Sequence, residues 1–103
     1  MKDYDHIVLT ILENDDLEEL KGLYEEEQFE LNKPMTVLKY ATLMCNHEIL
    51  QYLVNVEKLR PAEDFSSWLS HLKDDVANNR IKYSDEEFKE NQLKNIQFIE
   101  NFV

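Results

Sequence analysis

Turn-forming residues are scarce in this chain of 103 residues: Gly22 is the only glycine, and Pro34 and Pro61 are the only prolines. Tight turns between strands depend on such residues, so their scarcity favours helices joined by short connectors. The apolar residues also recur at three- and four-residue spacing in every segment, which is the period of an amphipathic helix. We therefore predict an all-α fold, and the length predicts one domain with a modest core.

Six apolar stripes predict six helices in three pairs, with the last two helices longer than the first four. The stripes are Tyr4, Ile7, Val8, Ile11 and Leu12; Leu17, Leu20, Leu23 and Tyr24; Val37, Leu38, Ala41, Met44 and Cys45; Ile49, Leu50, Leu53 and Val54; Phe65, Trp68, Leu69, Leu72 and Val76; and Phe88, Leu93, Ile96, Ile99 and Phe102. Pro61 suits the first turn of the fifth helix, and Ser84 with Glu87 has the form of a capping box for the sixth. We expect a single domain over 1–103, made of helical pairs at 1–33, 34–58 and 61–103.

The segment from Thr36 to Val54 carries a spaced pattern that needs no gap over nineteen residues. The matching positions are Thr36, Leu38, Ala41, Glu48, Ile49, Leu50, Leu53 and Val54. The pattern resembles an ankyrin repeat, whose motif runs Thr-Pro-Leu-His, a small residue, Gly-His, Glu-Ile-Val and a closing apolar pair. Val37 and Lys39 replace the motif's Pro and first His, and Cys45 and Asn46 replace its Gly and second His. Because Asn tolerates a left-handed backbone, we expect the turn to shift to Asn46.

The helical pair before this repeat matches it more weakly. A shift of thirty residues places Val8 on Leu38 and Leu20 on Leu50, and a shift of about 33, the usual ankyrin period, also matches apolar positions, so the register stays open. The last forty or so residues do not match and form a divergent pair. The resemblance implies a short ankyrin-like solenoid of about six helices, and a family of protein-binding scaffolds that are rarely enzymes. The initial Met1 and the polar first helix favour a complete chain over a fragment of a longer array.

The cysteine count and the N-terminal segment limit the classes of protein to which this chain can belong. Cys45 is the only cysteine, so an internal disulfide is excluded. The apolar run near the N-terminus is short and flanked by acids, unlike a signal peptide, and no run approaches the ~20 apolar residues of a membrane span. We expect a cytoplasmic protein that does not associate with membranes.

Cys45, His47 and Glu48 lie close together in the sequence and suggest a metal site or a thiol nucleophile. Zinc needs three or four ligands, and a catalytic cysteine needs a base and an oxyanion hole. Only two other histidines and no second cysteine are present. We therefore expect Cys45 to be a small, packed residue at a helix end.

Ser67, His71 and Asp75 have the residue types of a hydrolase triad. Their four-residue spacing places them along one face of one helix, where they cannot orient one another as a triad requires. His71 is better explained as a surface residue paired with Asp75. We expect no enzymatic activity, no metal and no cofactor.

Negative charge is concentrated in the first third of the chain. The net charge is −11; residues 1–30 hold eleven acids and two bases, and residues 31–103 hold eleven acids and nine bases. Such a field repels nucleic acid and attracts basic surfaces. Tyr24 and Phe29 bracket a run of three glutamates and suit a binding anchor, although the same rings also suit core packing. The predicted partner-binding residues are Asp15, Asp16, Glu18, Glu19, Tyr24, Glu25, Glu26, Glu27, Phe29 and Glu30.

These patterns predict a non-catalytic protein-binding module that inhibits a basic partner through an acidic surface, such as a bacterial toxin-immunity protein. Two alternatives stay open. One is a phage-type inhibitor that mimics nucleic acid and occupies a DNA- or RNA-binding protein. The other is an ankyrin-type structural or assembly module whose acids serve only solubility. The expected partner is a protein with a basic surface, such as a toxin or a nucleic-acid-binding protein, rather than nucleic acid or membrane; the oligomeric state stays open.

Overall fold

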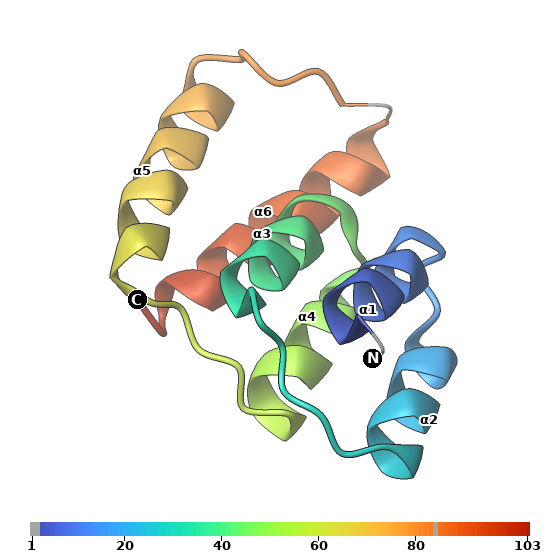
Figure 1. The fold of residues 1–103 in the computed structure, drawn as a ribbon. Helices are drawn as coiled ribbons and strands as arrows, with labels where there is room; N and C mark the ends of the chain where they lie inside the picture. Colours follow the sequence, from blue (N-terminus) through green and yellow to red (C-terminus); the bar gives the residue numbers. More distant parts are fainter. Residues whose placement is uncertain (1–2, 84) are drawn as a thin grey trace.

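The computed structural model describes residues 3–83 and 85–103, except for the side chain of Glu63. The helices are α1 (Tyr4–Glu13), α2 (Leu17–Glu26), α3 (Pro34–Met44), α4 (His47–Gln51), α5 (Glu63–Ala77) and α6 (Glu86–Glu100), as Figure 1 shows. The described residues form no strand, so the predicted all-α fold of six helices is confirmed. The fourth helix differs in kind, because α4 is only five residues long and continues as a π-helical turn at Tyr52–Val56.

Helix α3 lies in the middle of the molecule and contacts α1, α4 and α6. Helices α1 and α2 cover one side of it, and α5 stands at the opposite edge, packed against α6 (Figure 1). The first helical pair, α1–α2, and the last pair, α5–α6, therefore flank a common centre. This arrangement gives the molecule two separate outer surfaces, one on α2 and one on α5.

Aspartates begin three of the helices. Asp3, Asp16 and Asp85 each accept a hydrogen bond from the backbone N–H three residues later, at N–O distances of 3.2, 3.1 and 2.7 Å. The N-cap of α6 is thus Asp85, whereas the predicted cap Ser84 lies outside the described residues. Pro61 precedes α5 instead of occupying its first turn, because that helix begins at Glu63.

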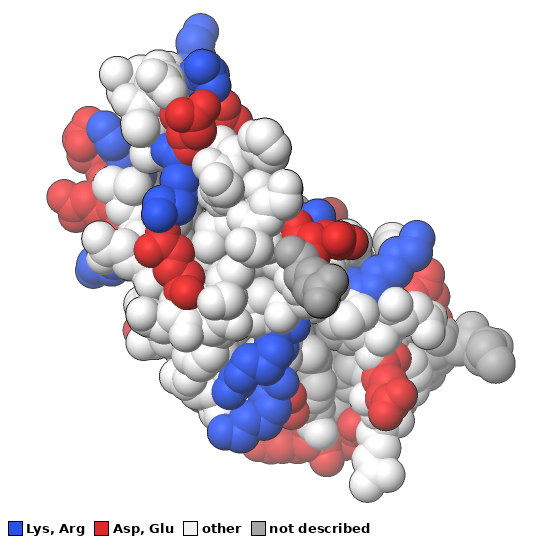
Figure 2. Space-filling model, turned by 90° about the vertical axis from the view of Figure 1, so that its left-hand side faces the viewer, with Lys and Arg blue, Asp and Glu red and all other residues white. Residues whose placement is uncertain are grey.

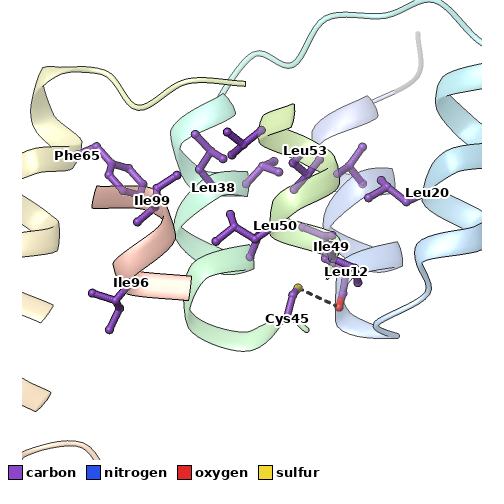
Figure 3. Packing of buried hydrophobic residues seen from close by; sticks show 14 of the residues in the cluster. Leu12, Leu20, Leu38, Cys45, Ile49, Leu50, Leu53, Phe65, Ile96 and Ile99 are labelled. Atoms are coloured by element: carbon purple, nitrogen blue, oxygen red, sulfur yellow. Dashed lines mark hydrogen bonds between the residues drawn. The ribbon is translucent and has the colours of Figure 1, made fainter. Parts of the chain in front are cut away.

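A single apolar core joins all six helices, and Figure 3 shows its central side chains. Most of the predicted stripes are buried, including Leu12, Leu38 and Ile99. Two predicted core residues are wrong: Met44 is 52 % exposed at the end of α3, and Leu93 is 36 % exposed on α6. The inward positions of α6 hold polar side chains as well as apolar ones, which displaces Leu93 from the core face.

The turn between α3 and α4 is extended, which corrects the predicted left-handed turn at Asn46. Cys45 and Asn46 have φ of −98° and −58°. Asp15, in the turn between α1 and α2, has a left-handed backbone instead, with φ of 52°. Its Oδ1 accepts a hydrogen bond from the Asn46 backbone N–H at 3.0 Å, and its Oδ2 accepts one from the Asn46 side-chain amide. The two inter-helix turns are thus bonded to each other.

Amide side chains on α6 brace the same turn from its other side. The Asn91 and Asn95 side-chain amides donate to the Cys45 carbonyl at 2.7 and 2.9 Å, and Gln92 donates to the Leu43 carbonyl. Asn91 Oδ1 accepts from the His47 backbone N–H at 2.9 Å. These bonds satisfy carbonyls that the end of α3 leaves without helical partners. They fix α6, and with it the C-terminal pair, to the centre of the fold.

Candidate protein-interaction surface

The outer side of α2 carries four exposed glutamates, Glu18, Glu19, Glu25 and Glu26, which we call the acidic face. Each glutamate lies seven residues, or two helical turns, from another member, so the four project from one side. The opposite side packs Leu20 and other apolar residues against the core. The helix is therefore amphipathic, and its acidic face is held toward solvent by burial of the other side.

The predicted acids nearest the start of α2 have a structural role. Asp15 bonds to Asn46 across the inter-helix turns, and the Asp16 carboxylate caps the helix at Glu19 N. Both carboxylates thus have backbone partners, whereas the acids of the acidic face have none among the residues that the structure describes. The sequence groups all of these acids together, and the structure divides them into turn-forming and outward-facing sets.

The two predicted aromatic residues belong to a cluster of four rings. Phe29 stacks on Tyr4 with ring centroids 4.5 Å apart and planes 4° apart, and it lies 4.7 Å from Tyr24. Tyr24 also meets Tyr52 edge to face at 6.1 Å. The Asp5 carboxylate accepts hydrogen bonds from the backbone N–H groups that follow Leu31, at 2.8 and 2.6 Å. These contacts hold the extended connector between α2 and α3 against α1.

A groove of about 490 Å³ lies between this connector and the end of the π-helical turn. We call it the aromatic groove, and it is lined by Tyr24, Glu27, Gln28, Phe29, Glu30, Leu31, Pro34, Glu57 and Leu59. Four of these residues are in the predicted partner-binding set. The lining holds three carboxylates and no base. The groove therefore combines ring surface with negative charge, which is the combination that attracts organic cations.

The hydroxyl groups around the groove stay protonated at neutral pH. Burial, followed by the charges of Glu57 and Asp5, raises the pKa of Tyr24 to about 12. The Tyr24 hydroxyl is buried and has no hydrogen-bond partner among the described residues. Burial and a 2.6 Å hydrogen bond donated to Glu57 Oε2 raise the pKa of Tyr52. Tyr24 thus keeps an unused donor and acceptor beside the groove.

Sequence reasoning did not identify Tyr52 or Glu57 as part of this surface. Tyr52 is more than twenty residues from the acidic segment, and Glu57 lies in a connector with no distinctive pattern. Only the return of the chain through α4 places them beside Tyr24. The one available signal was Phe29, an aromatic residue within an otherwise polar connector.

Cys45 is a packed residue at the end of α3, as the sequence predicts. It is fully buried, and its Sγ donates a hydrogen bond to the Leu12 carbonyl at 3.6 Å (Figure 3). Burial, with the charge of Asp15, raises the pKa of its thiol to about 12. The ring of His47 is engaged by α6 through Asn95 Oδ1 at 2.8 Å. Cys45 and His47 therefore serve packing and bracing in this arrangement.

The second group of candidate catalytic residues, the triad-like set of Ser67, His71 and Asp75, lies along α5. Ser67 and His71 are exposed, and Asp75 pairs with Arg80 at 3.1 Å, so the predicted pairing of His71 with Asp75 is replaced by one with the following loop. Within residues 3–83 and 85–103, no three His, Cys, Asp or Glu side chains are grouped as metal ligands. In the same part of the chain, no helix has the length and apolar character needed to cross a bilayer.

Comparison with protein-family models, with curated proteins and with solved structures finds no match to this chain. The resemblance to ankyrin repeats therefore rests on the residues of 36–54 alone.

Proposed function

We propose that this protein is a non-catalytic inhibitor that binds a basic partner protein through the acidic face and the adjoining aromatic groove. A bacterial toxin-immunity protein is the type of protein that this proposal fits best. Such a partner would present a basic surface of its own, for example the active cleft of a nuclease. The acids would then speed association by electrostatic steering as well as fill the cleft.

The main observation behind the proposal is the excess of negative charge on the exposed side of α2. The ion pairs among the described residues join Lys73 to Glu100 and Arg80 to two acids, all on α5, α6 or the loop between them. None involves the acidic face. The four glutamates concentrate negative charge on the exposed side of α2, and a basic partner bound there would neutralise it.

The proposal also includes an ankyrin-type relation between the first two helical pairs. Helix α1 packs on α3, as the stacking of successive helical pairs requires. Cys45 bonds to Leu12, 33 residues earlier, and Asn46 bonds to Asp15, 31 residues earlier. Both separations lie near the ankyrin period and support a register that relates the two turns. Repeats of this kind serve as binding scaffolds in the ankyrin family.

Two charge-neutral variants test the proposal. The α2 variant carries Glu18→Gln, Glu19→Gln, Glu25→Gln and Glu26→Gln. The control variant carries Asp64→Asn, Glu86→Gln, Glu87→Gln and Glu90→Gln, which changes net charge equally and also alters two acids in the first turn of a helix. Proteins captured by each variant from extracts of the source cell are identified, purified and assayed for inhibition of their activity.

We expect the wild type and the control variant to capture the same basic protein and to inhibit it, while the α2 variant loses about tenfold or more in affinity. Capture of partners without a basic surface, or equal binding by both variants, would contradict the proposal. A captured protein that binds DNA or RNA and is released by that nucleic acid would favour the mimic alternative.

A further inference from the structure

The aromatic groove has a chemistry distinct from that of the open acidic face. It is concave and lined by the rings of Tyr24 and Phe29, whereas the acidic face is a row of exposed carboxylates on one helix. Its volume of about 490 Å³ lies within the range of pockets that hold a small organic group. A groove of this size admits one long side chain of a partner.

We propose that the aromatic groove is a socket for one arginine side chain of the basic partner, an inference that rests on the proposed function. The guanidinium stacks against the ring surface of the groove, and its N–H groups are directed at the carboxylates of Glu57 and Glu30. The aliphatic stem of the arginine lies against Leu31, Pro34 and Leu59.

Three features of the lining favour arginine over lysine. A guanidinium is planar, stacks on aromatic faces and presents several N–H donors, whereas an ammonium is a compact and strongly hydrated charge. Glu57 is half-buried and already oriented by the hydroxyl of Tyr52 at 2.6 Å, so one of its oxygens is fixed while the other is left for a ligand. Apolar residues along the groove suit a long stem better than a free ion.

The protein itself contains contacts of the kind that we propose. The guanidinium of Arg60 lies 4.7 Å from the centroid of the Phe102 ring. The ammonium of Lys21 lies over Tyr52 at 6.0 Å, at the outer limit for such an attraction. The ring cluster thus already has one cation at its edge, and the groove beside it is lined by three carboxylates and no base.

The hydroxyl of Tyr24 is the second independent observation. Buried polar groups are nearly always hydrogen-bonded, and an exception in a native fold calls for an explanation. This hydroxyl has no partner among the described residues, and its pKa is raised partly by the nearby charge of Glu57. In the proposed complex, the Tyr24 oxygen accepts a hydrogen bond from the guanidinium that is bound at Glu57.

The test is an NMR titration of the isotope-labelled full chain with blocked arginine, in which both termini of the amino acid are capped. Blocked lysine and blocked citrulline, a neutral isostere of arginine, are the comparison ligands. We expect saturable shifts at the backbone amides of Tyr24, Phe29 and Glu57 with arginine, about fivefold or more weaker binding of lysine, and no saturable binding of citrulline.

Two variants separate the socket from general attraction by acids. Glu57→Gln keeps an acceptor for the Tyr52 hydroxyl and removes the charge, so we expect about a tenfold loss of arginine affinity. Tyr24→Phe removes a hydroxyl that has no partner among the described residues, so the fold and thermal stability are retained while arginine affinity falls. Glu86→Gln, on the far helix α6, leaves the affinity unchanged and serves as the control.

The inference is overturned if arginine leaves the groove amides unshifted, if citrulline binds as well as arginine, or if Glu57→Gln retains the wild-type affinity. This assay contains no partner protein, so its result is independent of the capture experiment. Arginine binding without a captured basic partner would uphold the socket and contradict the proposed function. A basic partner that binds wild type and Glu57→Gln equally would uphold the function and contradict the socket.

Discussion

Helices α1–α2 and α5–α6 flank the same central helix, but they carry their charges differently. Residues 1–30 hold eleven acids and two bases, whereas residues 61–103 hold nine acids and five bases. On the face that carries α5, bases lie among the acids, as Figure 2 shows, and Arg80 bonds to Asp74 and Asp75 at 3.0 and 3.1 Å. The acidic face of α2 has no such partner among the described residues. The difference fits the proposed function, in which α2 would keep its charge for an external partner while α5–α6 would serve the stability of the fold.

The contribution of α5–α6 to stability is tested most directly by substitution of Asn95. Its side chain is fully buried and donates to the carbonyls of Ala41, Thr42 and Cys45 at 3.4, 3.3 and 2.9 Å. Asn95→Ala leaves buried acceptors unpaired, and we expect a loss of about 2–4 kcal/mol in the free energy of unfolding, measured in urea. Asn101→Ala, which removes one exposed amide at the C-cap of the same helix, is the control, and an equal loss in the two variants would contradict the bracing role.

The fold is expected to lose stability at alkaline pH. Burial raises the pKa of Cys45 from 9.0 to about 12 and that of Tyr24 from 10.0 to about 12. A raised pKa means that these protonated groups stabilise the fold fully below about pH 9, and that this contribution is lost as pH rises toward about 12. Urea unfolding across this range should therefore show falling stability. The decline should be shallower in Tyr24→Phe, and an identical slope would show that Tyr24 has no part in it.

The hydrogen bonds between the two inter-helix turns contribute less to the free energy of unfolding than Asn95 does. Asp15 adopts φ of 52° and accepts two hydrogen bonds from Asn46, one of them at 3.0 Å. Asp15→Ala removes both acceptors and keeps the strained backbone, so we expect a loss of about 1–2 kcal/mol by thermal or urea unfolding. Asp15→Asn retains one acceptor and tolerates the left-handed conformation, so it should recover most of the loss. Failure of Asp15→Asn to recover any stability would argue against the hydrogen bonds.

The smallest expected effect is on the acidic face itself. No two of its four glutamates are three or four residues apart, and Lys21 lies one helical turn from both Glu18 and Glu25. Repulsion and attraction along the helix therefore nearly cancel, and we expect the α2 variant to unfold within about 0.5 kcal/mol of wild type in urea. The control variant removes like-charge pairs and opposite-charge pairs together and should change as little. A loss of more than about 1 kcal/mol in the α2 variant alone would show that these glutamates stabilise the fold and would contradict the contrast between the two regions.

The sequence predicts much of the helical framework because apolar periodicity reports burial directly. The turn at Asn14–Asp16, the packed role of Cys45 and the two long final helices all follow from that signal. The inward face of α6 does not follow, because Gln92 and Asn95 are polar and look like solvent-facing residues in a pattern of hydrophobicity. Their carbonyl partners are about fifty residues away and exist only once α3 has ended beside α6.

The candidate surface was predicted in part for the same reason. A run of acids is visible in the sequence, and so is Phe29 in a polar connector. The division of these acids into turn-forming Asp15 and Asp16 and the outward glutamates depends on backbone partners. The contribution of Glu57 depends on the path of the chain after α4. Contacts of this kind arise from tertiary structure and leave no local pattern.

The most direct test of the central claim is the association rate of the captured partner, measured by stopped-flow at several salt concentrations with wild type, the α2 variant and the control variant. Electrostatic steering by the acidic face predicts a wild-type rate that falls steeply with salt, an α2 variant about tenfold slower at low salt, and a control variant that matches wild type. Equal rates for the two variants, or a wild-type rate that does not change with salt, would contradict the claim that α2 holds its charge for a basic partner.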